Sequence, residues 1–273
     1  MSGENFQSEW TAKGYFVVPQ LFDARLIREL KVICDDVFQL WLAESADPQK
    51  AANQTNMAYL TELRYFERQP ERLNMLLGVI AHEKILHIFR KTFDVEPLFH
   101  NTQYFFEPAS VTRSGDWHRD QQFGAPNVEA EKAAMSQKGF HAHIAFVPDD
   151  NLEIVPCTHA RWDTQQEFEI RKGINGRAPN ADDMPGAVRI SLEAGDACFF
   201  SAWSIHRGNY VNGKVRRTFD VIYAASASDE YTPPPMCFSQ SEVLDGLSGP
   251  TRLFFQRFIN AYKEKWKRSA YEY

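Results

Sequence analysis

The chain has 273 residues, of which 44% are hydrophobic and 14% aromatic, with 14 glycines and 14 prolines. This composition excludes a fibrous, low-complexity or mainly disordered protein, and the length is enough to bury a sizeable core. The formal net charge of -6 argues against nucleic acid or an anionic membrane surface as the partner, so we expect a small-molecule ligand.

Nothing in the sequence reads as a targeting or membrane segment. The first residues are polar and acidic, and no later stretch approaches the roughly 18 apolar residues of a membrane span. The four cysteines are widely spaced and include no C-x-x-C pair, so we expect them to be reduced and buried. They are Cys34, Cys157, Cys198 and Cys237. We therefore expect a soluble, cytoplasmic protein.

The first third of the chain is predicted to be mostly helical. A strand over Gly14–Pro19 is followed by Asp23, a plausible N-cap, and then by a helix that runs to about Leu42. A polar loop over Glu44–Asn56 leads to a helical region over Pro70–Phe93. The apolar residues predicted to share one face of the first helix are Leu26, Leu30, Ile33, Val37 and Leu40.

From Pro97 the pattern changes to short strands separated by turn residues. Many short strands favour a sandwich or barrel, and the chain has no G-x-G-x-x-G or Walker loop to support a nucleotide-binding fold. A final helix over Thr251–Trp266 is expected to pack against the strands. The strand-like runs are Leu98–Phe106, Phe140–Val147, Leu152–Val155, Val188–Leu192, Ala197–Phe200 and Thr218–Ala224.

The most informative motif is the stretch Gly-Asp-Trp-His-Arg-Asp at 115–120. At the end of a strand, His118 and Asp120 point to the same side, so a nitrogen and an oxygen can converge on one ion. His206 stands just past a short apolar strand that a Gly-Asp turn begins, and it is the candidate third ligand. Two imidazoles and one carboxylate leave three positions of an octahedral metal open, as in non-haem iron(II) oxygenases.

Two adjacent arginines, Arg216 and Arg217, begin the next strand and are candidates for binding a carboxylate cofactor. Guanidinium binds carboxylate through two parallel hydrogen bonds, which lysine cannot do. Neighbouring strand residues point to opposite faces, so only one of the two can face the interior. His141 and His143 could instead form a cupin-type ligand pair with His206, but they lack a well-spaced acidic partner, and we expect them to hydrogen-bond near the pocket.

Together these motifs resemble the phytanoyl-CoA dioxygenase-like family of iron(II) and 2-oxoglutarate-dependent oxygenases. The resemblance runs from Lys13 through the His-Arg-Asp motif and the stretch 149–159 to Tyr223. It implies a mainly β, double-stranded β-helix fold, which is a cupin-like jelly roll with an N-terminal helical buttress and a C-terminal helix. The single oxygenase domain would comprise helical support over 1–96, the jelly-roll core over 97–225 and an extension over 226–273.

The resemblance also implies a set of site residues. His118, Asp120 and His206 would hold iron(II), with 2-oxoglutarate and O2 as co-substrates. Arg216 would bind the distal carboxylate of 2-oxoglutarate and is preferred to Arg217, because Tyr223 follows it at the spacing of the family's strand. Gln103 is a further expected cofactor contact.

Two positions depart from the family's pattern. Cys157 stands where a glycine is usual in the loop before His159, which affects the geometry of that turn. Glu107 lies near the place where many relatives have lysine, so a second basic contact to the cofactor is missing. We expect His159 to fix its loop rather than to bind metal.

The aromatic residues Trp117, Phe123 and Trp203 flank the expected ligands and are predicted to line the substrate pocket, shielding it from water. The segment 125–139 follows the first two ligands and is too polar for the core. It is either a mobile lid or a solvated loop.

The expected activity is hydroxylation, or another oxidation, of a small and largely apolar metabolite in secondary metabolism, with decarboxylation of 2-oxoglutarate to succinate. Hydroxylation is the default because Asp120 is present, whereas related halogenases carry a small residue at that position. The alternative is a cupin-like jelly roll that binds or isomerises a small ligand without oxygenase activity. A structural or partner-binding domain is a third possibility, which no heptad, charged tail or repeat supports.

Overall fold

The computed structural model describes residues 5–227, 232–239 and 241–268. Its strands are β1 Tyr15–Val18, β2 Asn56–Ala58, β3 Leu98–Phe106, β4 Arg113–Ser114, β5 Gly139–Ala145, β6 Asp149–Ile154, β7 Val188–Leu192, β8 Ala197–Phe200, β9 His206–Tyr210 and β10 Arg217–Ala224. Its α-helices are α1 Phe6–Lys13, α2 Ala24–Glu44, α3 Pro48–Ala51, α4 Pro70–Ile80, α5 Glu83–Phe93, α6 Val128–Ala134, α7 Gln165–Lys172, α8 Ser241–Asp245 and α9 Gly249–Arg268. Short 3₁₀ helices lie at η1 Leu63–Tyr65, η2 Asp120–Phe123 and η3 Cys237–Ser239.

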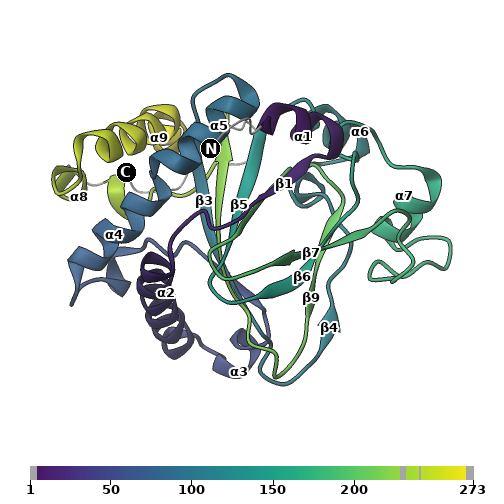
Figure 1. Cartoon of the computed structure of the whole chain (residues 1–273), viewed down its shortest axis with the longest axis horizontal. Coiled ribbons are helices and arrows are strands. Elements are labelled where there is room, and N and C mark those ends of the chain that lie inside the picture. The colour runs from purple at the N-terminus through teal and green to yellow at the C-terminus, as the bar shows by residue number, and fades with distance from the viewer. Residues whose placement is uncertain (1–4, 228–231, 240, 269–273) are drawn as a thin grey trace.

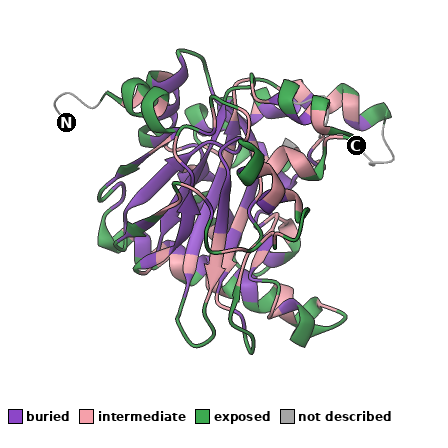
Figure 2. Ribbon diagram, turned by 90° about the vertical axis from the view of Figure 1, so that its right-hand side faces the viewer, coloured by how far each residue is buried: buried purple, intermediate pink, exposed green. Residues whose placement is uncertain are grey.

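The strands form two sheets. The six-stranded sheet has the order β1-β8-β5-β10-β3-β2, and the four-stranded sheet has the order β4-β9-β6-β7. The pairings within them are antiparallel. Helices α2, α4, α5 and α9 gather on one side of the larger sheet, and the smaller sheet lies on its other side (Figure 1). Buried residues concentrate on the strands, whereas the helices turn exposed faces to solvent (Figure 2).

Strand β10 shows how the sequence divides the two faces of the larger sheet. Phe219, Val221 and Tyr223 belong to the main hydrophobic cluster, which includes residues of the covering helices. Asp220 and Ile222 alternate with them and line a cavity on the other face. A strand has a side-chain period of two, so one polar residue within this apolar run marks the cavity face.

Helix α2 begins where the sequence predicts, because the Asp23 carboxylate accepts the N–H groups of Arg25 and Leu26. The predicted apolar face is partly wrong, since Leu40 is 42% exposed. A strict seven-residue spacing drifts around a straight helix, so Phe38 takes the buried place and packs on Phe106, with ring centroids 4.2 Å apart. The buried side of the helix is formed by Ile27, Leu30, Ile33, Cys34, Val37 and Phe38.

Three further details of local structure go beyond the prediction. The predicted helical region over Pro70–Phe93 is confirmed as two helices, because the first ends at Ile80 and His82 caps the second, its Nδ1 accepting the N–H of Lys84. The predicted polar loop before it contains α3, which Asp47 caps. Strand β9 was not predicted, because its sequence His-Arg-Gly-Asn-Tyr lacks the β-branched residues typical of strands.

All four cysteines are free, and Cys34, Cys198 and Cys237 are buried as expected. Cys157 is exposed, which contradicts the prediction for that residue. Its φ is +66°, in the left-handed region that favours glycine. Among the described residues, no helix is long and apolar enough to cross a membrane.

This backbone conformation makes Cys157 a test of the turn geometry. Replacing Cys157 with glycine removes the steric cost of holding a residue with a Cβ in the left-handed conformation, which is about 1–2 kcal/mol. The same change increases the conformational entropy of the unfolded chain, which lowers the stability by about 0.4–1 kcal/mol. We expect Cys157→Gly to raise the free energy of unfolding slightly, and Cys157→Ala, which keeps the Cβ, not to raise it. Urea denaturation of both variants measures the difference. A greater loss of stability in the glycine variant would show that the turn imposes no such cost.

Candidate active site

A cavity of about 740 Å³ lies between the two sheets. Strands β3, β5 and β10 of the larger sheet and β9 of the smaller one contribute to its wall, together with the segment that follows β4. His118, Asp120 and His206 all line it. The sequence motifs thus meet in one hollow of the fold.

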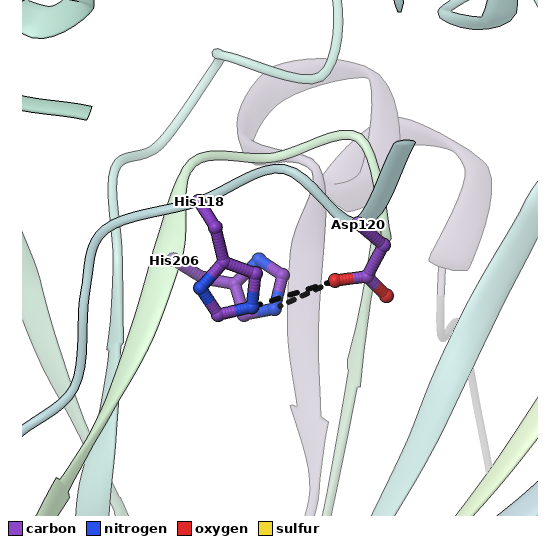
Figure 3. A group of neighbouring side chains, drawn as sticks. All are labelled: His118, Asp120 and His206. Carbon is purple, nitrogen blue, oxygen red and sulfur yellow. Dashed lines mark ion pairs between the residues drawn. The ribbon is translucent and has the colours of Figure 1, made fainter. Parts of the chain in front are cut away.

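One nitrogen of His118, one nitrogen of His206 and one oxygen of Asp120 lie within 4.8 Å of one another. The backbones of the two histidines form an antiparallel bridge, with both N–H···O distances 3.0 Å, so their rings lie side by side (Figure 3). Asp120 is held nearby because its N–H donates to the carbonyl of Ala202 at 3.1 Å. In the described part of the chain, this is the group of three that is arranged to hold a metal ion.

Hydrogen bonds to the backbone orient both imidazoles. Nδ1 of His118 lies 2.8 Å from the carbonyl of Asp116, and Nδ1 of His206 lies 2.9 Å from the carbonyl of Ser204. A carbonyl only accepts, so each Nδ1 carries the proton, and each Nε2 keeps a lone pair that faces Asp120. The Nε2 atoms are 3.5 and 3.4 Å from Oδ1 of Asp120. Burial lowers the pKa of His206 to about 3, which keeps its ring neutral and able to ligate.

The other oxygen of Asp120 has a different partner. Oδ2 lies 2.9 Å from Nε2 of His141, whose Nδ1 lies 2.8 Å from the carboxylate of Asp220. Partial burial would raise the pKa of Asp120, but the hydrogen bond and charge of His141 hold that pKa below its usual range. Burial would lower the pKa of His141, but the two carboxylates raise it to about 10. The arrangement therefore keeps Asp120 ionised.

Arg216 faces the cavity and Arg217 does not. The guanidinium of Arg216 lies over the rings of Phe105 and Tyr210, at 4.9 and 5.2 Å from their centroids, and the side chain lines the cavity. Its Nε lies 3.4 Å from Asp149, while its buried Nη1 has no hydrogen-bond partner among the described residues. Such an orphaned donor is rare in folded proteins and fits an added carboxylate.

Arg217 points to the opposite face of β10. Its Nε donates to Asp35 of α2 at 2.8 Å, and its Nη1 donates to Glu107. Glu107 also accepts the backbone N–H of Arg216 at 2.9 Å and is not part of the cavity wall. Glu107 therefore binds Arg217 and the backbone of the strand rather than lining the cavity.

The remaining predicted residues divide between wall and core. Gln103, Phe123 and Trp203 line the cavity, and Phe123, whose ring lies beside that of His118, is 74% exposed. Trp117 is fully buried and is absent from the wall, which disagrees with its predicted role. It neighbours His118 in an extended segment and so points the other way, where its indole N–H donates to Ala181 at 2.8 Å. His159 is also absent from the wall.

The segment 125–139 is less solvated than the sequence suggests. It contains α6, and Glu131 on this helix is buried against Arg171 and Lys172 of α7, at 2.5 and 2.8 Å. The prediction that this segment is too polar for the core is therefore wrong at Glu131. A buried ion pair between two helices supplies the compensation that burial of a charge requires.

Arg119 lies between His118 and Asp120 in the sequence, and its side chain anchors this segment in the protein interior. Its side chain is fully buried and donates to Asp163 through Nε and Nη2, at 2.9 and 2.7 Å. The second oxygen of Asp163 accepts two hydrogen bonds from Arg171, at 2.9 and 2.6 Å. Sequence reasoning missed this network, because its members are far apart in the chain and match no short motif. Asp220 was also missed, although a lone acid in an apolar strand is a readable signal.

The chain matches one protein-family model and several solved structures. The family model described as phytanoyl-CoA dioxygenase (PhyH) matches residues 10–218. No curated protein sequence matches the chain significantly. A solved structure of EctD from S. alaskensis, with 2-oxoglutarate and 5-hydroxyectoine, is 14% identical and has a TM-score of 0.60, covering 82% of this chain and 76% of its own.

Two further structures are similar. HygX from Streptomyces hygroscopicus, with nickel and 2-oxoglutarate bound, is 10% identical with a TM-score of 0.61, covering 85% of this chain and 90% of its own. SnoN, the non-haem alpha-ketoglutarate-dependent epimerase from nogalamycin biosynthesis, is 17% identical with a TM-score of 0.56, covering 82% and 80%. These likenesses confirm the predicted cupin-like jelly roll with flanking helices, although its sheets form no closed barrel.

Proposed function

The chain belongs to the phytanoyl-CoA dioxygenase family, and from this premise we propose that it is an iron(II)- and 2-oxoglutarate-dependent oxygenase acting on a small molecule. The observation that carries the proposal is the convergence of two Nε2 atoms and one carboxylate oxygen within 4.8 Å at the wall of a cavity. Iron(II) with 2-oxoglutarate and O2 supplies the oxidising chemistry, in which 2-oxoglutarate becomes succinate and carbon dioxide.

His118, Asp120 and His206 would hold the iron. The donor set fits, because neutral imidazoles and a carboxylate suit non-haem iron and because the backbone carbonyls already fix both rings. All three side chains line the cavity, so a metal ion held by them would be accessible to co-substrate and substrate.

Arg216 would bind the distal carboxylate of 2-oxoglutarate. Its orphaned Nη1 lacks an acceptor, and the rings of Phe105 and Tyr210 hold the guanidinium plane in place. Gln103 on the neighbouring strand is a second proposed contact, since it lines the same cavity.

This assignment predicts different effects for the two adjacent arginines. Truncating one member of a buried charged pair costs about 2–5 kcal/mol, so Arg216→Ala should raise the half-saturating 2-oxoglutarate concentration about tenfold or more. Arg216→Lys keeps the positive charge but loses the two parallel hydrogen bonds that a guanidinium can donate to a carboxylate, so it should also raise that concentration. Arg217→Ala is the matched control and should leave it within about twofold, because Arg217 contacts Asp35 and Glu107 on the other face.

Titration of 2-oxoglutarate at saturating iron measures all three variants. The opposite pattern, with the large loss in Arg217→Ala, would mean that the strand register assigned to β10 is wrong by one residue.

We propose hydroxylation as the reaction. Asp120 supplies the carboxylate ligand, and Phe105, Phe200 and Trp203 in the cavity wall shield the reacting atoms from water. The wall also carries hydrogen-bonding side chains, so the proposed substrate is a small metabolite with polar groups rather than a purely apolar one. These side chains include Asn56, His100, Gln121 and Gln137.

Oxygen uptake separates this function from a cupin-like binding protein or isomerase. With iron(II) and 2-oxoglutarate but no other substrate, an oxygenase consumes O2 slowly in uncoupled turnover, and omission of iron or of 2-oxoglutarate stops it. A binding protein or a metal-independent isomerase consumes no more O2 than the same mixture of iron(II) and 2-oxoglutarate without protein.

A further inference from the structure

His141 on β5 links the carboxylate of Asp120 to a second, buried carboxylate on β10. Its Nε2 lies 2.9 Å from Asp120 and its Nδ1 lies 2.8 Å from Asp220. Carboxylate oxygens only accept hydrogen bonds, so both ring nitrogens donate. The ring also stacks on Phe200, with centroids 4.7 Å apart and planes 16° apart. The two hydrogen bonds and the stacking on Phe200 together fix the orientation of the His141 ring.

The contact with His141 determines how Asp120 faces the two histidines. Oδ2 is occupied by His141, whereas Oδ1 faces Nε2 of His118 and of His206, at 3.5 and 3.4 Å. The Asp120 side chain is 32% exposed, so packing alone does not hold it. His141 donates a hydrogen bond to this carboxylate, whereas the Nε2 atoms of His118 and His206 carry no proton to donate to it.

Asp220 fixes His141 in turn. It is buried and lies on β10 directly opposite His143 of β5, two residue pairs away from the pair that contains His141. Nδ1 of His143 lies 3.6 Å from the same oxygen of Asp220, beyond hydrogen-bond distance. The short contact of Asp220 is therefore the one to His141, and it prevents the ring from turning away from Asp120.

We propose that His141, anchored by Asp220, is a positioning residue that presents Asp120 to the metal through a single oxygen. The inference rests on the proposed metal site. A carboxylate can ligate through one oxygen or two, and two would occupy a position that an oxygenase needs for its co-substrates. With Oδ2 held in a hydrogen bond to His141, Asp120 would offer the metal one oxygen and would leave that position to the co-substrates.

The test measures cobalt(II) affinity of the metal-free protein, followed by the visible absorption of the bound ion. His141→Phe keeps a ring on Phe200 but removes both donors, and it should weaken cobalt binding about 10- to 100-fold. His141→Gln places a donor near the former Nε2, so it should recover most of the affinity. His143→Phe is the matched control on the same strand, because it does not contact Asp120, and it should bind cobalt as the wild type does.

Melting temperatures of all variants identify loss of folding. His141→Phe leaves the carboxylate of Asp220 buried beside an apolar ring, which can destabilise the fold. The double variant His141→Phe with Asp220→Asn removes this buried charge. We expect its cobalt affinity to be as low as that of His141→Phe. The inference is overturned if His141→Phe binds cobalt as tightly as the wild type. It is also overturned if His143→Phe loses as much affinity as His141→Phe.

His118→Ala separates this inference from the proposed function. If His118→Ala loses cobalt while His141→Phe does not, the metal site stands and the positioning role fails. If His118→Ala binds cobalt like the wild type, the metal site itself is wrong. Weak binding in both variants, with recovery in His141→Gln, supports both.

Discussion

Replacing His206 with alanine is expected to lower the affinity for iron(II) by about 100-fold or more and to abolish turnover. The Nε2 of His206 would be one of the three donor atoms of the proposed metal site, and loss of a supporting residue at a metal site already costs about 10- to 100-fold in affinity. Binding is measured by anaerobic titration of the metal-free protein. The same result is expected for His118→Ala, because the two rings lie side by side.

His159→Ala is the control for this experiment. His159 is a partly buried histidine near Trp10 that lies outside the cavity wall, so its loss should leave iron affinity unchanged. Equal iron affinity in His206→Ala and the wild type would remove His206 from the metal site.

Asp163→Asn is expected to lower the free energy of unfolding by about 3–5 kcal/mol. The carboxylate of Asp163 accepts two hydrogen bonds from Arg119 and two from Arg171, and all three side chains are almost completely inaccessible to solvent. Asparagine keeps the shape but offers one acceptor oxygen and no charge, so Arg119 loses the carboxylate with which it pairs and Arg171 is left with Glu131. Chemical denaturation measures the loss.

Asp183→Asn provides the comparison, since Asp183 pairs with Arg177 at 2.6 Å on the surface. An exposed pair contributes little, so this change should stay within about 0.5 kcal/mol. Similar losses in the two variants would mean that burial adds nothing to the Asp163 network. Because Arg119 lies between two proposed ligands, Asp163→Asn should also weaken metal binding.

Much of the fold was predictable because it is encoded locally. Asp23 caps α2 through neighbouring N–H groups, and the boundaries of β3, β7 and β8 follow from apolar runs between turn residues. Strand β9 could not be predicted from its own residues, because pairing with segments far away in the sequence stabilises it. Its first residue, His206, pairs with both Ile154 of β6 and His118.

The candidate site also combines residues that short sequence motifs predict with contacts that only the completed fold creates. The spacing of His118 and Asp120 and the adjacency of Arg216 and Arg217 are visible in the sequence, and alternation along a strand explains why Arg216 alone turns inward. The supporting contacts are not visible, because Arg119 meets Asp163 across 44 positions. Pairing at that range depends on the completed fold and follows no short spacing rule.

Succinate formation from 2-oxoglutarate tests the central claim most directly. The wild-type protein, supplied with iron(II), 2-oxoglutarate and air, is expected to form succinate, and a chelator or the His206→Ala change is expected to stop it, while His159→Ala continues. Succinate formation that persists in His206→Ala, or its absence from the iron-loaded wild type, would contradict the assignment of this chain as an iron(II)- and 2-oxoglutarate-dependent oxygenase.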